Sequence, residues 1–164
     1  MERERKFLVT EKPPRLSRFK CAKIEQGYLS LDNGQPGHFE VRLRCTDGSK
    51  YTLTIKKKKQ TPTRLEKEIK LTPAAAKKLW PLTAGRRVVK TRYDIPYRGH
   101  TIELDVYRGK TRGLVTAEVE FSSLAAMRKF KPPQWMKKEV TGRSKYANAR
   151  LAVFGWKNGK RPRK

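Results

Sequence analysis

Apolar and polar residues alternate along much of the chain, which is the pattern of β-strands with two different faces. In residues 40–45, Val41, Leu43 and Cys45 point to one side and the charged residues between them point to the other. The same alternation predicts eight strands, over residues 2–8, 24–31, 40–45, 51–56, 64–71, 87–94, 102–106 and 115–121. Turn sequences separate several of them, among them Asp32-Asn33-Gly34, Asp47-Gly48 and Arg98-Gly99.

Three short helices are predicted between and after the strands, over residues 72–80, 122–130 and 144–155. Thr72-Pro73 begins the first as an N-cap followed by a first-turn proline, and Pro132-Pro133 follows the second. Residues 157–164 are basic and are expected to form a disordered tail. The chain shows no internal repeat, so we expect one domain over residues 1–156.

The polar positions of the predicted strands are unusually rich in charge. They carry nine acids, Glu2, Glu4, Glu40, Glu66, Glu68, Glu103, Asp105, Glu118 and Glu120. They also carry seven bases, Lys6, Arg42, Arg44, Lys56, Arg64, Lys90 and Arg92. On an open sheet these residues would form exposed cross-strand salt bridges, which is one interpretation of the pattern.

The second interpretation is a sheet that closes with its charged faces inward. Eight antiparallel strands can close into a barrel and so remove their edges. The interior would then be a tunnel lined by acids and bases. Because buried charges are costly, such a tunnel is expected to hold water and to bind a highly charged ligand. Bases bind phosphate oxygens and carboxylates bind hard divalent cations. We therefore expect a mainly β (α+β) fold, a closed eight-stranded antiparallel β-barrel tunnel with a few flanking helices.

Composition excludes several classes of protein. No apolar run approaches the roughly 20 residues needed to span a membrane, and the first residues have no apolar signal-peptide core, so a cytoplasmic protein is expected. Two cysteines and two histidines form neither a disulfide framework nor a zinc site. A metal ion would therefore rely on carboxylates, which favours Mg²⁺ or Mn²⁺.

The chain carries 41 basic and 15 acidic residues in 164, a net charge of +26. The acids and bases of the alternating positions nearly cancel, so the positive excess lies elsewhere on the surface. This indicates either deliberate supercharging of a natural protein or a surface that binds polyanions such as nucleic acid. A scaffold for such binding with weak or no catalysis stays an alternative. Either a monomer or a homodimer is possible, and repulsion disfavours the dimer.

A set of short motifs resembles the CYTH domain, or triphosphate tunnel metalloenzyme, family. In order they are ERERKFLV at the N-terminus, QGYLS at 26–30, VRLR at 41–44, TIK at 54–56, Arg64-x-Glu66-x-Glu68, KTRY at 90–93, ELDVY at 103–107, AEVEF at 117–121, and EVT and KYAN within 139–148. The resemblance covers roughly residues 1–152. It implies an eight-stranded tunnel that depends on Mg²⁺ or Mn²⁺ and hydrolyses inorganic triphosphate, nucleoside triphosphates or thiamine triphosphate; some members are adenylate cyclases.

The resemblance also implies roles for individual residues. The expected metal ligands are Glu2, Glu4, Asp105, Glu118 and Glu120. The expected triphosphate-binding residues are Lys6, Arg42, Arg44, Lys56, Arg64, Lys90 and Arg92. Glu66 and Glu68 are expected to assist catalysis, as is Tyr28 if it is not simply a wall residue. Glu103 and Asp105 are also candidates to orient the bases, and Glu139 is a candidate structural partner at the end of the tunnel.

Three basic features depart from the family pattern. Arg3 occupies a position that is usually apolar, Lys57–Lys59 occupy a loop that is usually Gly-rich or acidic, and Lys137-Lys138 replace a stretch that contains glycine. Since Arg3 and Lys57 lie near tunnel strands, the added charge is expected to weaken catalysis.

Overall fold

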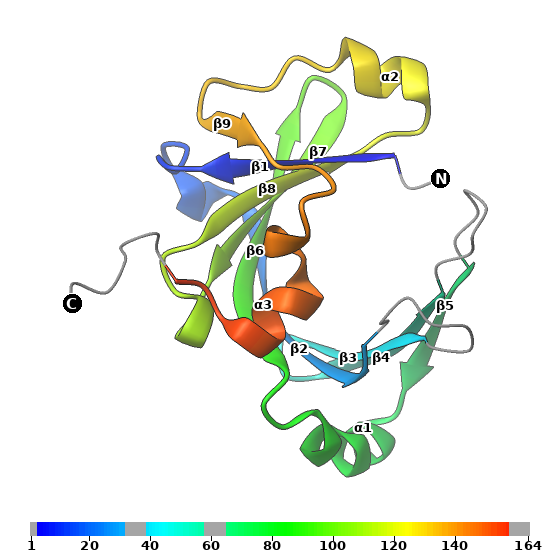
Figure 1. The fold of residues 1–164 in the computed structure, drawn as a ribbon. Coiled ribbons are helices and arrows are strands. Elements are labelled where there is room, and N and C mark those ends of the chain that lie inside the picture. Colours follow the sequence, from blue (N-terminus) through cyan, green and yellow to red (C-terminus); the bar gives the residue numbers. More distant parts are fainter. Residues whose placement is uncertain (1–2, 32–38, 58–64, 158–164) are drawn as a thin grey trace, which may run out of the picture.

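In the described residues, nine β-strands form a single antiparallel sheet that is strongly curved (Figure 1). The computed structural model describes residues 3–31, 39–57 and 65–157. The strands are β1 (Glu4–Val9), β2 (Lys20–Ser30), β3 (Glu40–Thr46), β4 (Lys50–Lys57), β5 (Leu65–Leu71), β6 (Arg87–Tyr97), β7 (His100–Tyr107), β8 (Val115–Glu120) and β9 (Met136–Glu139). Their order across the sheet is β5-β4-β3-β2-β6-β7-β8-β1-β9.

Among the described residues, three α-helices and four short 3₁₀ turns connect or follow the strands. The α-helices are α1 (Pro73–Leu79), α2 (Leu124–Lys129) and α3 (Asn148–Phe154). The 3₁₀ turns are η1 (Leu16–Arg18), η2 (Trp80–Thr83), η3 (Gly109–Thr111) and η4 (Ser144–Tyr146). All three predicted helices are confirmed, although the third begins as the 3₁₀ turn η4 before α3 starts.

The mainly β, antiparallel fold class is confirmed, and the structure adds two features to it. The strand β9 was not predicted, because four residues with two adjacent lysines give no clear alternation. The second feature is that the barrel is not closed by hydrogen bonds. In the part of the chain that the structure describes, no ladder joins β5 to the opposite end of the sheet. The edge of β1 that a closed barrel would offer to β5 is instead paired with β9 over Phe7–Val9. The predicted turn at Asp32-Asn33-Gly34 and the tail from residue 158 lie outside the described residues.

The two faces of the sheet bury different kinds of side chain. The outer face of β1, β7 and β8 is an apolar core in which Ile102, Leu104, Ala117 and Val119 are fully buried. The inner face is charged along most of its length. Burying the apolar face of the strands is what drives the sheet to form, at roughly 25 cal/mol per Å² of apolar surface. The charged face is therefore held in place by packing on its other side.

The helix α3 lies inside the curve of the sheet, where Figure 1 shows it between the two arms of the curve. Its residues Leu151 and Ala152 are buried in a second apolar cluster with Tyr28, Val88 and Tyr107 of the sheet. Apolar packing of α3 thus fills one part of the space inside the curved sheet, and the charged residues of the inner face lie beside it.

Gly27 lets the 3₁₀ turn η2 pack directly on the outer face of β2. A Cβ atom at this position would lie 2.5 Å from the Cβ and Oγ1 atoms of Thr83, which is fully buried. Thr83 in turn donates a hydrogen bond to the carbonyl of Trp80 and accepts one from Arg87. Because the outer face is fixed in this way at Gly27, the residues on either side of it, Gln26 and Tyr28, are held on the inner face.

We expect Gly27→Ala to destabilise the protein by about 1–3 kcal/mol, because the added methyl group overpacks the contact with Thr83. Urea unfolding followed by circular dichroism measures this loss. Lys20→Ala, at an exposed position of the same strand, is the control and should change the free energy of unfolding by less than about 0.5 kcal/mol. Equal stability of the two variants would contradict the close packing described here.

Candidate functional site

The register of the strands gathers the predicted charged residues on the inner face. Glu4 of β1 lies opposite Glu120 of β8, and Lys6 lies opposite Glu118. Further along the sheet the cross-strand pairs are Glu103–Glu118, Arg92–Asp105, Tyr28–Arg42, Glu40–Lys56 and Lys56–Glu66. Residues two apart on one strand share a face, so the alternation in the sequence becomes a continuous charged surface.

This surface lines a cavity of about 830 Å³. The predicted site residues on its wall are Glu4, Lys6, Tyr28, Arg42, Arg44, Lys56, Glu66, Arg92, Glu118 and Glu120, together with Glu103. The α3 helix contributes Asn148, Arg150 and Phe154 to the wall, and Arg3 lines it near Phe121. In the described part of the chain, the structure therefore brings these predicted residues together around one cavity.

A fully buried carboxylate, Asp105 on β7, lies behind the cavity wall. Arg92 of β6 binds it with two parallel hydrogen bonds, from Nε to Oδ1 at 2.7 Å and from Nη2 to Oδ2 at 2.8 Å. Lys90, also fully buried, forms an ion pair with the same Oδ2 atom. Both oxygens of Asp105 are therefore engaged by cations.

The electrostatics of this group follow from burial and from the close charges. Burial raises the pKa of Asp105, but Lys90 and Arg92 outweigh it and hold the pKa far below its ordinary value. Burial lowers the pKa of Lys90 to about 8, against the attraction of Asp105. At neutral pH the carboxylate and both cations are ionised, so the group is a charged unit rather than a neutral one.

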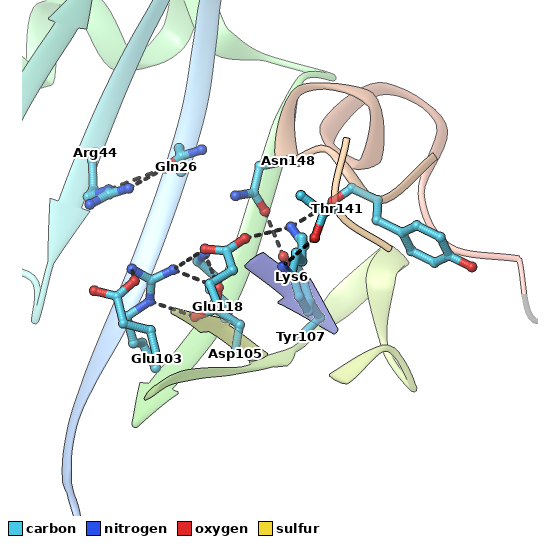
Figure 2. A network of polar contacts seen from close by, with 12 residues as sticks. Lys6, Gln26, Arg44, Glu103, Asp105, Tyr107, Glu118, Thr141 and Asn148 are labelled. Carbon is cyan, nitrogen blue, oxygen red and sulfur yellow. Dashed lines mark hydrogen bonds and ion pairs between the residues drawn. The ribbon is translucent and has the colours of Figure 1, made fainter. Parts of the chain in front are cut away.

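Glu118 connects this unit to the N-terminal strand and to the C-terminal segment (Figure 2). It accepts a hydrogen bond from Nη2 of Arg92 at 3.2 Å and forms an ion pair with Nζ of Lys6 at 2.7 Å. Lys6 also donates to the carbonyl of Tyr146, at 2.8 Å, in the turn before α3. Burial opposes ionisation of Glu118, but Lys6, Lys90 and Arg92 offset it and lower its pKa.

Three bases on β3 and β4, namely Arg42, Arg44 and Lys56, form a separate wall. Lys56 pairs with Glu66 at 3.0 Å, while Arg42 reaches the same carboxylate only at 4.0 Å. The Nε atom of Arg42 is buried and has no hydrogen-bond partner among the described residues. Arg44 makes its hydrogen bonds to Gln26. Arginine N–H groups in this arrangement are suited to bind phosphate oxygens in the cavity.

Carboxylates crowd together on the opposite side of the cavity. Glu4 and Glu120 face one another across strands, as do Glu103 and Glu118. Like charges in directly opposed positions are unfavourable. Burial raises the pKa of Glu4, and the charges of Glu118 and Glu120 raise it further, although Lys6 and Lys56 oppose them. Burial likewise raises the pKa of Glu103, with Arg92 opposing it.

These carboxylates are oxygen donors of the kind that a hard divalent cation prefers. Glu4 lies opposite Glu120 and feels the charge of Glu118, a repulsion that a cation would relieve, so the residues present fit a metal ion. No three of the acidic, histidine or cysteine side chains in the described part of the chain are already gathered into a ligand cluster.

Some predicted site residues occupy other places. Lys90 and Asp105 do not line the cavity and lie behind its wall, and Glu68 is exposed and accepts a hydrogen bond from Thr54 at 3.2 Å. Glu139 forms an ion pair with Arg5 at 2.7 Å and is not on the wall. Glu2 and Arg64, with Lys58 and Lys59, lie outside the described residues.

Sequence reasoning missed three residues that hold the site together, Gln26, Tyr107 and Asn148. Tyr107 donates a hydrogen bond to the amide oxygen of Asn148 at 2.7 Å, which ties α3 to the sheet. Gln26 could have been found from its spacing, since it shares a strand face with Tyr28. The pairing of Tyr107 with Asn148 joins residues far apart in the chain and leaves no local signal.

The described residues contain no helix long and apolar enough to cross a membrane. Cys21 is exposed and Cys45 is half-buried, and both are free thiols.

We expect Asp105→Asn to lower the free energy of unfolding by about 3–5 kcal/mol, because Lys90 and Arg92 then lose the buried carboxylate that neutralises them. A depressed pKa in the folded state stabilises the protein above the unfolded value of about 3.9, and this stabilisation is lost as the pH falls below it. The difference in unfolding free energy between wild type and variant should therefore shrink from pH 5.5 to pH 3.

Chemical denaturation at the two pH values measures that difference. Asp94→Asn, on the same strand face as Arg92, is the matched control and should show a small change at both pH values. A penalty for Asp105→Asn that is equally large at pH 3 would contradict the charged state described for this carboxylate.

Known proteins resemble this chain over nearly its whole length. The profile of the CYTH domain matches residues 1–132. An inorganic triphosphatase of Nitrosomonas europaea is 40% identical over 154 residues, covering 93% of this chain and 97% of that protein. An inorganic triphosphatase of Acetivibrio thermocellus is 33% identical over 160 residues, covering 97% of each. A crystal structure of an inorganic triphosphatase superposes with a TM-score of 0.71 at 39% identity, covering 93% of this chain and 95% of the other. With its curved antiparallel sheet and its charged interior, the chain belongs to the CYTH domain family.

Proposed function

We propose that this protein is a metal-dependent triphosphatase that hydrolyses inorganic triphosphate in the cavity inside its sheet. The observation that carries the proposal is the division of the cavity wall, with Arg42, Arg44 and Lys56 on one side and Glu4 and Glu120 on the other. One side suits the phosphate oxygens and the other suits a cation that accompanies them. Relatives at 40% and 33% identity, aligned over nearly the whole chain, carry the name inorganic triphosphatase.

The bases act by binding and orienting the phosphate chain. Phosphoryl transfer needs little covalent participation from the protein, and positioning with charge stabilisation supplies most of the effect. Arg42 offers a buried Nε–H group without a partner in the described chain, and Arg44 and Lys56 stand beside it on the same wall. Lys6 and Arg92 add positive charge at the opposite side, and Arg64 is assigned the same role from the sequence.

The carboxylates Glu4, Glu118 and Glu120, with Glu2 from the sequence, would hold Mg²⁺ or Mn²⁺. When bound, the ion neutralises charge on the phosphates and lowers the pKa of a water molecule. Glu66 stands on the arginine wall, bound to Lys56, and orients that base. Glu68 is assigned a supporting role in positioning water.

Asp105 and Lys90 act at one remove from the substrate. Both oxygens of Asp105 are bound to Lys90 and Arg92, so its placement fits the orienting role better than that of a metal ligand. Arg92 reaches the cavity with three of its nitrogens already bound to carboxylates, which fixes its plane. The buried group thereby sets the shape of the wall on which the phosphates lie.

The alternatives are less well supported. Adenylate cyclase activity and a catalytically inactive polyanion-binding scaffold find no parallel in the names of the two relatives. The two free thiols fit a reducing, cytoplasmic compartment. A nonspecific affinity of the basic exterior for nucleic acid would weaken steeply with salt, whereas binding inside the cavity would weaken less.

The test of this function is phosphate release from inorganic triphosphate, ATP and thiamine triphosphate, each with Mg²⁺ or Mn²⁺. We expect inorganic triphosphate to be the best substrate. The double variant Glu4→Gln, Glu120→Gln should lower the rate about 100-fold or more, because it removes two anionic ligands of the ion. The proposal is wrong if the wild type releases phosphate no faster than this variant.

Arg42→Lys should raise the KM for inorganic triphosphate about tenfold, because lysine lacks the buried Nε–H donor. Arg86→Lys is the matched control, since Arg86 also has a buried Nε atom without a partner in the described chain but does not line the cavity. Steady-state kinetics measures both. An equal rise in KM for the two variants would mean that the effect on Arg42 is general rather than local to the cavity.

A further inference from the structure

We propose that Gln26 is a positioning residue of this cavity, whose side-chain amide sets the direction of the Tyr28 hydroxyl proton and the orientation of the Arg44 guanidinium. The inference rests on the proposed function, because the group that these two side chains would meet is a phosphate chain. Gln26 lies on β2, is 1% exposed and is not itself on the cavity wall. It touches the substrate site only through its two neighbours.

Arg44 determines which way the amide of Gln26 points. Its Nε and Nη2 atoms lie 3.2 and 3.1 Å from Oε1 of Gln26, and Figure 2 shows this pair apart from the cluster around Asp105. A guanidinium group has donors and no acceptor, so the atom that faces it has to be the amide oxygen. The amide nitrogen is then turned toward Tyr28, 2.6 Å from the hydroxyl oxygen.

This orientation leaves the proton of Tyr28 free for the cavity. The Tyr28 oxygen accepts a hydrogen bond from Gln26, so its own O–H group has to donate elsewhere. No other described residue accepts a hydrogen bond from it, and Tyr28 is one of the residues on the cavity wall. Burial raises the pKa of Tyr28, with Glu40 adding to the effect, so the hydroxyl stays protonated. It is a donor placed for a phosphate oxygen.

The same amide holds Arg44 without neutralising it. Gln26 takes up two of the five N–H groups of the guanidinium and leaves the others available. Arg44 makes no ion pair with a carboxylate in the described part of the chain, in contrast to Arg92. Burial lowers the pKa of Arg44, and the charges of Arg42 and Arg92 lower it further, which outweighs the opposing effect of Asp105 and Glu68. The neutral amide of Gln26 thus orients Arg44 and leaves its positive charge available to bind a phosphate.

The variant Gln26→Glu has nearly the same shape and reverses the donor direction. A glutamate at this position would accept from Arg44 with one oxygen and from the Tyr28 hydroxyl with the other. The phenol proton would then turn away from the cavity, and Arg44 would be paired with a carboxylate. The added negative charge also repels phosphate directly, so the test has to separate these effects.

A double-mutant cycle separates them. The dissociation constant of inorganic triphosphate is measured by calorimetry for wild type, Gln26→Glu, Tyr28→Phe and the double variant. Direct repulsion is the same in both backgrounds, whereas the effect on the phenol proton exists only where the hydroxyl is present. We expect Gln26→Glu to weaken binding about tenfold more in the wild type than in the Tyr28→Phe background, at unchanged melting temperatures. An equal loss in the two backgrounds would overturn the proposal.

A second measurement is independent of binding and of catalysis. Tyr28→Phe removes the acceptor of the amide nitrogen, so it should shift the side-chain NH₂ resonances of Gln26 in a ¹⁵N–¹H spectrum. Unchanged resonances would overturn the assigned orientation. If the wild type binds triphosphate but releases no phosphate, the proposed hydrolysis fails while the binding cycle still decides the role of Gln26.

Discussion

One buried carboxylate, Asp105, organises the charged half of this molecule. It lies at 0% exposure and is bound by Arg92 and Lys90, so the adjacent strands β6 and β7 can meet only in the register that brings these charges together. Removing charges from water is costly, and the cost is offset only when each charge finds its partner. The outer apolar core supplies the net stability. The carboxylate favours the correct strand register, because any other register would leave buried charges without partners. Glu118 and Lys6 extend this alignment to the N-terminal strand and to the turn before α3.

The cavity wall has two halves that use charge in opposite ways. On the side of β6–β8, cations are bound to carboxylates and are rigid. On the side of β3, Arg42 and Arg44 have few anionic partners, and Arg44 is held by a neutral amide. A site with every cation paired would have little attraction for a phosphate chain, and one with every cation unpaired would repel itself. The structure combines a fixed frame with cations that are free to bind.

The period-two pattern was sufficient to predict the inner face, because alternation depends only on the strand geometry of each segment. It placed Glu4, Arg42 and Arg92 on one surface without knowledge of which strand pairs with which. The pattern could not predict which of these residues reach the cavity. Strand pairing decides that Asp105 is buried behind the wall while Glu103 lines it. The strand β9 and the position of α3 inside the curve depend on contacts between distant segments. For the same reason the hydrogen bond between Tyr107 and Asn148 could not be predicted from the sequence.

The opposed glutamates Glu4 and Glu120 have a consequence for how this protein behaves in solution. Two like charges held face to face on one wall, with Arg42 and Arg44 on the opposite wall and few carboxylates near them in the described chain, favour a ligand that carries both kinds of charge. Any solute that satisfies these groups binds the folded chain and not the unfolded one, and so adds RT ln(1 + [L]/Kd) to the free energy of unfolding. If phosphate or a divalent ion fills the proposed site, the thermal stability of the protein depends on its buffer as well as on its sequence.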